Sequence, residues 1–250
     1  MIKEQLHTIP IHDAINEAGE CPFCYIERKL EERMLDFVLG PSSSYMEADI
    51  RDQTDRVGFC RQHFKKMFDY GNALGNAWIL KTHLKRQIEE LETVSKKYKP
   101  GKKRSLFSKG EENPITEWGK KREESCYICD TLKQSFANYM DTFFTLYKKE
   151  SEFREQILKG QGFCLTHFTK LLEAADQKLN AEELDAFYQV MIPFETEQLK
   201  RVYEDVAWFI EKYDYKNRDA DWKNSKDANQ RGMQKLKGAD PSDPPYVMKK

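Results

Sequence analysis

The chain has 250 residues, of which 33% are charged, and its formal net charge is −1. This length suffices for one large or two small domains with a real core. The near-zero charge gives no reason to expect nucleic acid or an anionic membrane as the main partner. No apolar run reaches the roughly 20 residues that span a bilayer, and the N-terminus lacks the pattern of a secretory signal, so we expect a cytoplasmic protein without a membrane segment.

The first half of the chain has two strong helical patterns. Residues 25–39 are rich in Glu, Arg, Leu and Met, which favour helix, and Gly40 and Pro41 provide the stop. Residues 72–94 carry apolar side chains at steps of three and four. These are Ala77, Leu80, Leu84, Ile88 and Leu91. This spacing predicts an amphipathic helix.

A basic segment at residues 96–115 separates this half from the next. It holds Pro100 and Gly101 together with six basic side chains, which are Lys96, Lys97, Lys99, Lys102, Lys103 and Arg104. Because unsupported lysines are common in linkers, we interpret it as a solvated hinge. The alternative is a segment that contacts the backbone of nucleic acid.

The second half repeats this helical plan. An apolar stripe runs from Phe136 to Tyr147, and another from Leu199 to Tyr213 follows Pro193, where we expect the chain to bend or break. No segment shows the sustained alternation of strands, although short β elements near the cysteine pairs stay open. The sequence therefore predicts a mainly α protein with repeats at 1–95 and 116–215. A tail at 216–250 is expected to be partly docked or disordered.

The six cysteines all fall within a duplicated motif. Cys21-Pro-Phe-Cys24 is followed by Gly58-Phe-Cys60-Arg-Gln-His63-Phe64, and Cys126-Tyr-Ile-Cys129 is followed by Gly162-Phe-Cys164-Leu-Thr-His167-Phe168. The cysteine pair recurs after 105 residues and the Cys–His pair after 104. Such register indicates a tandem duplication. Spaced cysteines in a reducing compartment indicate metal or redox chemistry.

Three thiolates and one imidazole are a donor set typical of structural zinc. Pairing within each copy is the simplest arrangement, and it predicts two Zn²⁺ ions per chain. The ligands of the first would be Cys21, Cys24, Cys60 and His63, and those of the second Cys126, Cys129, Cys164 and His167. Pairing between the copies is the alternative. Each ion would cross-link its own helices and contribute on the order of 10–16 kcal/mol to folding.

Other chemistry fits the motifs less well. A thiol redox centre would need a strand before its CxxC and a mixed sheet around it. An iron–sulfur cluster usually takes four cysteines, and catalytic zinc needs an open position that four protein ligands do not leave. Buried, unliganded cysteines would not explain two matching quartets. His7, His12 and His83 are weak candidates, and we identify no catalytic residue.

The doubled motif, together with the aromatic and acidic stretch from Trp208 to Trp222, resembles an uncharacterised bacterial family known only as a domain of unknown function. The resemblance extends from Cys21 to about Gly238 and implies that this stretch, with Lys226 to Ala228, belongs to the family pattern. It implies no activity. We therefore expect a non-enzymatic interaction or adaptor protein that binds zinc and engages a protein partner. A thiol or iron–sulfur redox protein and a nucleic-acid-binding protein are the alternatives.

Overall fold

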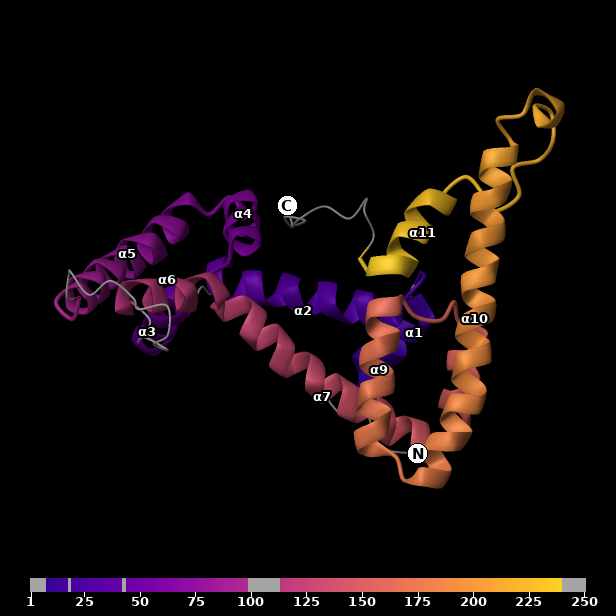
Figure 1. Ribbon diagram of the computed structural model, residues 1–250, viewed down its shortest axis with the longest axis horizontal. Helices are drawn as coiled ribbons and strands as arrows, with labels where there is room; N and C mark the ends of the chain where they lie inside the picture. Colours follow the sequence, from indigo (N-terminus) through magenta and orange to yellow (C-terminus); the bar gives the residue numbers. More distant parts are fainter. Residues whose placement is uncertain (1–7, 18, 42–43, 99–112, 240–250) are drawn as a thin grey trace, which may run out of the picture. The chain divides into compact units, whose positions relative to one another are not determined.

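The computed structural model describes residues 8–17, 19–41, 44–98 and 113–239, and every regular element in these ranges is helical (Figure 1). The elements are α1 (Thr8–Glu17), α2 (Pro22–Leu39), η1 (Ser44–Met46), α3 (Ala48–Val57), α4 (Arg61–Tyr70), α5 (Ala73–Ser95), α6 (Pro114–Glu124), α7 (Tyr127–Lys149), α8 (Ser151–Lys159), α9 (Leu165–Lys178), α10 (Ala181–Glu211), η2 (Tyr215–Asn217) and α11 (Ala228–Lys237). The mainly α fold is thus confirmed, and the described ranges hold no β element. None of their helices is both long enough and apolar enough to cross a bilayer.

The chain forms two compact units, each built from segments of both halves of the sequence. Unit 1 comprises the described residues of 1–30 and 134–244, and unit 2 comprises those of 31–133. The boundaries therefore fall inside α2 and inside α7. The units do not coincide with the predicted repeats, because the helices that start at the two cysteine pairs both continue from one unit into the other.

Most of the predicted helices are confirmed. The pattern at 25–39 belongs to α2, which ends at Leu39 before Gly40 and Pro41. The pattern at 72–94 is α5, which Asn72 caps by accepting a hydrogen bond from Gly75 N at 2.9 Å.

We expected the chain either to bend or to break at Pro193, and helix α10 does not break there. The helix continues through this proline from Ala181 to Glu211. Phe187, Met191 and Val202 on either side of it are buried in unit 1. Tertiary packing therefore outweighs the loss of one backbone hydrogen bond.

The core of unit 1 is aromatic. Its largest fully buried side chains include Phe23, Phe143, Phe153, Phe163 and Phe187. Phe143 is surrounded by rings, with centroids 5.4–5.5 Å from those of Phe23, Phe144 and Phe153. The predicted stripe on α7 is therefore a core face, as the period of its apolar residues indicated.

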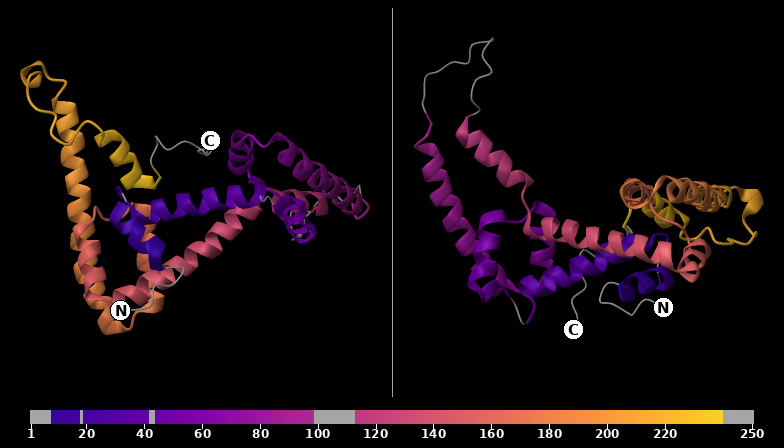
Figure 2. Two further views of the ribbon diagram at one scale, coloured as in Figure 1. Left: turned by 180° about the vertical axis from the view of Figure 1, so that it is seen from behind. Right: turned by 90° about the horizontal axis from the view of Figure 1, so that it is seen from below.

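The core of unit 2 is smaller and leaves one apolar face in solvent. Leu35, Leu39, Met67 and Ile79 are buried, whereas the predicted stripe on α5 is not. Helix α5 packs against α3 and α6 through its opposite face, and Figure 2 shows α5 and α6 as neighbours in its right-hand view. Periodicity identified the helix correctly, but it does not reveal which side of a helix the rest of the chain covers.

The tail contains further helix. Lys212, which is 7% exposed, donates from Nζ to the carbonyls of Asn217, Arg218 and Ala220, so that the chain after α10 wraps around one ammonium group. Helix α11 follows and packs against α9 and α10. Residues 99–112 of the predicted basic linker and residues 240–250 of the tail lie outside the described ranges, and so does His7.

Candidate metal centres

Each Cys–His motif is positioned at the start of a helix. Cys164 is the N-cap of α9, with extended backbone angles, and His167 lies in the first turn. Gly162 turns the chain just before it with a φ of 77°, a conformation that L side chains rarely adopt. Gly58, with a φ of 76°, and Cys60, the N-cap of α4, repeat this geometry. The motif therefore encodes a turn that presents a thiol and an imidazole from one helix end.

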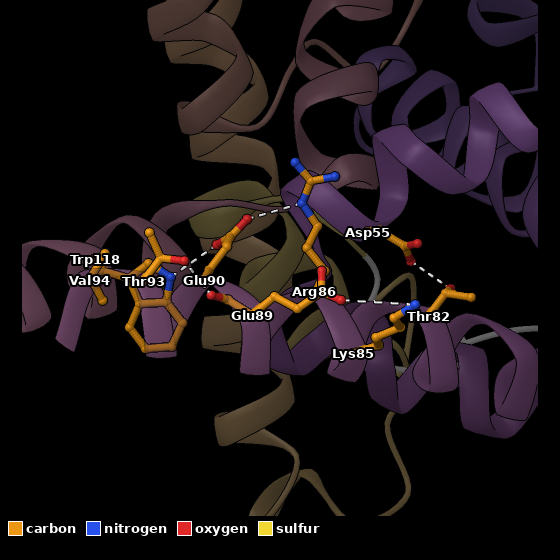
Figure 3. Close-up of a pocket in the computed structure, with 9 residues that line it drawn as sticks. All are labelled: Asp55, Thr82, Lys85, Arg86, Glu89, Glu90, Thr93, Val94 and Trp118. Atoms are coloured by element: carbon orange, nitrogen blue, oxygen red, sulfur yellow. Dashed lines mark hydrogen bonds and ion pairs between the residues drawn. The ribbon is translucent and has the colours of Figure 1, made fainter. Parts of the chain in front are cut away.

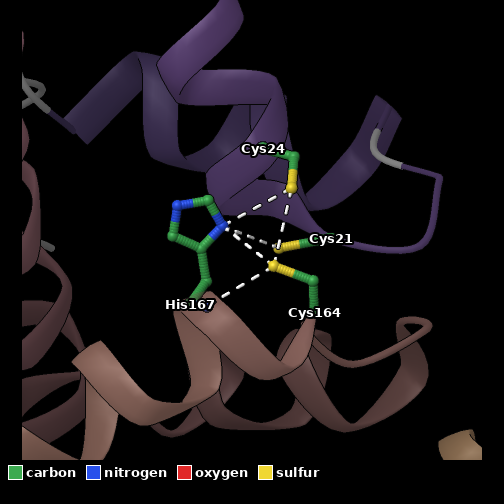
Figure 4. Close-up of side chains that lie close together, drawn as sticks. All are labelled: Cys21, Cys24, Cys164 and His167. Carbon is green, nitrogen blue, oxygen red and sulfur yellow. Dashed lines mark hydrogen bonds between the residues drawn. The ribbon is translucent and has the colours of Figure 1, made fainter. Parts of the chain in front are cut away.

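The first quartet, which we call cluster 1, lies in unit 1 and is shown in Figure 4. It consists of Cys21, Cys24, Cys164 and His167, all buried. His167 Nδ1 lies 3.5, 3.4 and 3.2 Å from the sulfurs of Cys21, Cys24 and Cys164, and the sulfurs of Cys24 and Cys164 are 3.7 Å apart. Four donors converge on one point from the N-termini of α2 and α9.

The second quartet, cluster 2, lies in unit 2 and consists of Cys60, His63, Cys126 and Cys129. His63 Nδ1 lies 3.2 Å from the sulfurs of both Cys60 and Cys126 and 3.4 Å from that of Cys129. The sulfurs of Cys60 and Cys129 are 3.9 Å apart. Here the donors come from the N-termini of α4 and α7.

The dimensions of both clusters suit a tetrahedral zinc ion. Zinc–sulfur bonds of about 2.3 Å and zinc–nitrogen bonds of about 2.0 Å require sulfur–sulfur edges of about 3.8 Å and sulfur–nitrogen edges of about 3.5 Å. The sulfur–sulfur separations of 3.7 and 3.9 Å and the nitrogen–sulfur separations of 3.2–3.5 Å are close to these values. The residues present therefore fit a four-coordinate ion of this size in each unit.

All eight predicted ligand residues belong to these clusters, but the predicted pairing within each copy was wrong. Each CxxC meets the Cys–His pair of the other copy, which is the alternative that the sequence left open. Helix lengths give the physical reason. Helix α2 has 18 residues and α7 has 23, whereas α3 has 10 and α8 has 9. At 1.5 Å of rise per residue, α3 is much shorter than α2, and α8 is much shorter than α7. The chain therefore cannot return along the shorter helix to the cysteine pair at the start of the longer one.

A carboxylate lies behind each histidine. His63 Nε2 is hydrogen-bonded to Glu31 at 3.0 Å, and His167 Nε2 lies 3.0 Å from an oxygen of Glu27. Each carboxylate also contacts a lysine three residues after the histidine, Lys66 for Glu31 and Lys170 for Glu27. A carboxylate at Nε2 holds the proton there and leaves Nδ1 free for a metal ion, which is the usual outer-shell arrangement of metal-bound histidine.

Sequence reasoning did not identify these carboxylates. Glu27 and Glu31 counted only as good helix formers in α2. They lie four residues apart on one face of that helix, and the lysine three residues after each histidine recurs in both motifs. The recurrence of this lysine was the sequence feature that could have indicated an acidic partner beside each histidine.

The electrostatics of each cluster favour one thiolate. Burial lowers the pKa of His63, but contacts with Cys126 and Glu31 outweigh it and raise this pKa to about 10. Burial raises the pKa of Cys126, but His63 and backbone N–H groups lower it to about 6. Contacts with Cys21 and Cys24, and then with His167, hold the pKa of Cys164 far below its ordinary value. In contrast, burial and the neighbouring thiols raise the pKa of Cys21 well above its ordinary value, and they raise the pKa of Cys129 as well. Helix N-termini add positive potential beside one thiolate in each cluster.

The two clusters differ in access. The C-terminal end of α11 closes cluster 1, where Ala239 N donates to Cys24 Sγ at 3.2 Å. A Cβ added at Gly238 would lie 3.2 Å from the sulfur of Cys164 and 3.3 Å from that of Cys24. In cluster 2, by contrast, Cys129 is exposed and Cys60 is only half-buried. Cluster 1 is thus sealed, and cluster 2 is open on the side of Cys129.

Buried charges anchor α11 over cluster 1. Lys235 is 1% exposed, and its Nζ donates to the carbonyls of Glu20, Gln161 and Phe163. The same ammonium lies 3.6 Å from the carboxylates of Glu20 and Glu195. Glu195 in turn accepts a hydrogen bond at 2.8 Å from the backbone N–H of Phe163, the residue directly before Cys164. Lys235 and Glu195 therefore hold both α11 and the segment that leads to Cys164 in place.

Other candidate sites within the described ranges show no catalytic arrangement. His83 Nδ1 pairs with the carbonyl of Asp55 at 2.9 Å, and the ring of His12 packs edge-on against Phe153, so neither is a ligand in these clusters. An open groove of about 710 Å³ lies along α5 (Figure 3). Its main polar groups are already paired, since Glu90 binds both Arg86 and the indole N–H of Trp118.

Comparison with known proteins gives a family but no activity. The model of a family of unknown function, DUF6062, matches residues 2–243. No curated protein and no solved structure matches the chain.

Proposed function

The chain belongs to the DUF6062 family, whose function is unknown, and we propose that it is a zinc protein in which one structural ion stabilises each helical unit. The observation that carries this proposal is the pair of Cys₃His clusters, each with the edge lengths of a tetrahedral zinc site. Each ion would bridge two helix N-termini that are far apart in sequence. In unit 1 these are the N-termini of α2 and α9, and in unit 2 those of α4 and α7.

The donor set favours a structural role over catalysis or redox work. Four protein ligands complete a tetrahedron and leave no position for substrate or water. Iron–sulfur clusters usually take four cysteines, so one histidine per site favours zinc. Cys21 is 1% exposed and Cys24 is 8% exposed, which leaves this CxxC little access for thiol exchange. None of the six cysteines, all of which lie in the described ranges, forms a disulfide, which is consistent with a reducing cytoplasm.

We also propose that the two halves arose by tandem duplication. Helices α1–α5 and α6–α10 follow one another in the same order, with a CxxC at the start of the second helix and a Cys–His pair at the start of the fourth. Because each CxxC meets the Cys–His pair of the other copy, the two copies would depend on each other for metal binding. Such a protein suits an interaction or adaptor role with a protein partner, because its ions stabilise helices and leave their outer faces available.

Elemental analysis of protein purified without added metal tests this proposal. We expect close to two zinc atoms per chain and no visible absorption, because each cluster offers one closed tetrahedral site. The thiols should be silent toward a thiol reagent until the metal is removed. Protein that folds fully without metal would contradict the proposal. Iron with visible absorption would instead favour an iron–sulfur protein.

The difference in access between the clusters predicts two rates of metal loss. With a colorimetric chelator in excess, we expect one ion to leave quickly from cluster 2, where Cys129 is exposed, and the other slowly from cluster 1 beneath Ala239. The variant Cys60→Ser should lack the fast phase, whereas Cys164→Ser should retain it. Two ions released at one common rate would be inconsistent with a sealed cluster 1.

A further inference from the structure

Helix α5 carries an apolar stripe that nothing in the described chain covers. Its members are exposed by 40–58%, and they are Leu80, Leu84, Ile88 and Leu91. Three- and four-residue steps place them on one face of the helix. The opposite face is occupied, since Thr82 binds Asp55, Arg86 binds Asp52, and Glu90 binds Trp118. The stripe therefore points away from the contacts that fix α5 within unit 2.

The order of residues along the stripe is self-complementary. If a second α5 lies antiparallel across it, Leu84 of one helix faces Ile88 of the other, and Leu80 faces Leu91. Each of the four side chains then meets another of similar size, and the twofold axis passes near position 86. An isologous contact of this kind closes on itself and gives a dimer.

Charges on one flank of the stripe have the same symmetry. Lys81 lies at the N-terminal end of this flank and Glu92 at its C-terminal end, and Lys85 and Glu89 lie further around the helix beside the groove of Figure 3, all exposed. Antiparallel pairing brings equivalent flanks of the two helices together, as in coiled coils. Lys81 then approaches Glu92 of the other helix, and the twofold symmetry repeats this pair at the other end of the contact. Parallel pairing would set this flank against the opposite one, where Glu90 is already bound by Arg86 and Trp118.

The contacts that these charges make within one chain are weak enough to be exchanged. Lys81 Nζ lies 4.9 Å from the ring centroid of Trp78, and Lys85 Nζ lies 3.9 Å from a carboxylate oxygen of Glu89. Both contacts are on the surface, where such pairs contribute little to stability. The lysines and glutamates therefore remain available to a second helix.

We infer that α5 is a self-association surface, through which two copies of this chain pair antiparallel across Leu80, Leu84, Ile88 and Leu91. The charge pattern favours a second copy over an unrelated partner, because the acidic and basic residues complement each other within one sequence. A single helix pair buries less surface than a standard interface of about 1,600 Å². The dimer is therefore concentration-dependent. None of these four side chains belongs to either cluster.

Charge-reversed variants of the full chain test this pairing by sedimentation equilibrium. The acidic variant carries Lys81→Glu and Lys85→Glu, and the basic variant carries Glu89→Lys and Glu92→Lys. We expect the wild-type chain to move from monomer to dimer as concentration rises, while each variant alone stays monomeric because its flanks repel. An equimolar mixture of the two variants should recover the dimer, since their flanks attract.

Apolar variants test the stripe itself. Leu84→Glu with Ile88→Glu should give a monomer, whereas Ile210→Glu, at a site on α10 that is 65% exposed, should leave the association unchanged. Circular dichroism should be the same for all variants, because the substituted side chains are on the surface. A wild-type chain that stays monomeric throughout overturns the inference. A dimer that tolerates the charge-reversed variants, or a mixture that associates no better than its components, overturns it as well.

Discussion

The double variant Cys21→Ser/Cys164→Ser is expected to retain one metal ion per chain, whereas Cys21→Ser/Cys60→Ser is expected to retain none. Cys21 and Cys164 belong to the same cluster, so removing both damages only cluster 1. Cys60 belongs to cluster 2, so the second combination damages both sites. Pairing within each sequence copy would give the reverse result. Elemental analysis of the two proteins, purified in parallel, therefore distinguishes the two arrangements without a further structure.

The same variants should differ in which residues unfold. A structural zinc site couples on the order of 10–16 kcal/mol of binding free energy to folding, and the net stability of a domain is only roughly 5–15 kcal/mol. Loss of cluster 1 should thus unfold unit 1. Hydrogen exchange followed by mass spectrometry should show lost protection in α9 and α10, with α4 and α5 still protected. Uniform loss of protection in both units would contradict the assignment of one cluster to each unit.

The sequence predicted the helices and the eight cluster residues because both are encoded locally. Steps of three and four residues identify α5 and the core face of α7, and the duplicated motif identifies every cysteine and both histidines of the clusters. The pairing of the motifs was not accessible in this way. It depends on the relative lengths of α2 and α3 and of α7 and α8. No local sequence pattern indicates which cysteine pair a Cys–His pair will meet after the chain has turned back.

Burial of charge was the second feature that the sequence did not reveal. Glu20, Glu195 and Lys235 are typical of solvated helix surfaces, yet their side chains are 1–3% exposed. A lysine in a tail of mixed charge has no local signal for burial, because its environment comes from three distant segments. For the same reason, the apolar stripe of α5 was recognised as one face of a helix without any indication that it would remain in solvent.

The variant Lys235→Met is expected to destabilise unit 1 by about 3–5 kcal/mol, which is the usual cost of removing one partner from a buried ion pair. It would leave the carboxylates of Glu20 and Glu195 without their shared ammonium, and three backbone carbonyls without a donor. The control is Lys237→Met, because Lys237 is exposed on the same helix and should change stability by less than about 0.5 kcal/mol. Hydrogen exchange of α10 and α11 in increasing urea measures the effect within unit 1.

A second substitution identifies the cause of this destabilisation. Burial raises the pKa of Glu195, and Lys235 opposes that shift. The charged form of this carboxylate would therefore lose the most stabilisation if the lysine were removed. Glu195→Gln in the Lys235→Met background removes the uncompensated charge and keeps an oxygen that can accept from Phe163 N. We expect it to recover part of the lost stability. Recovery would attribute the anchoring of α11 to charge pairing, whereas a further loss would attribute it to the hydrogen bonds of Lys235 with backbone carbonyls. In the Lys235→Met chain, α11 should detach from cluster 1 more readily, and the metal ion there should reach a chelator faster than in the wild-type chain.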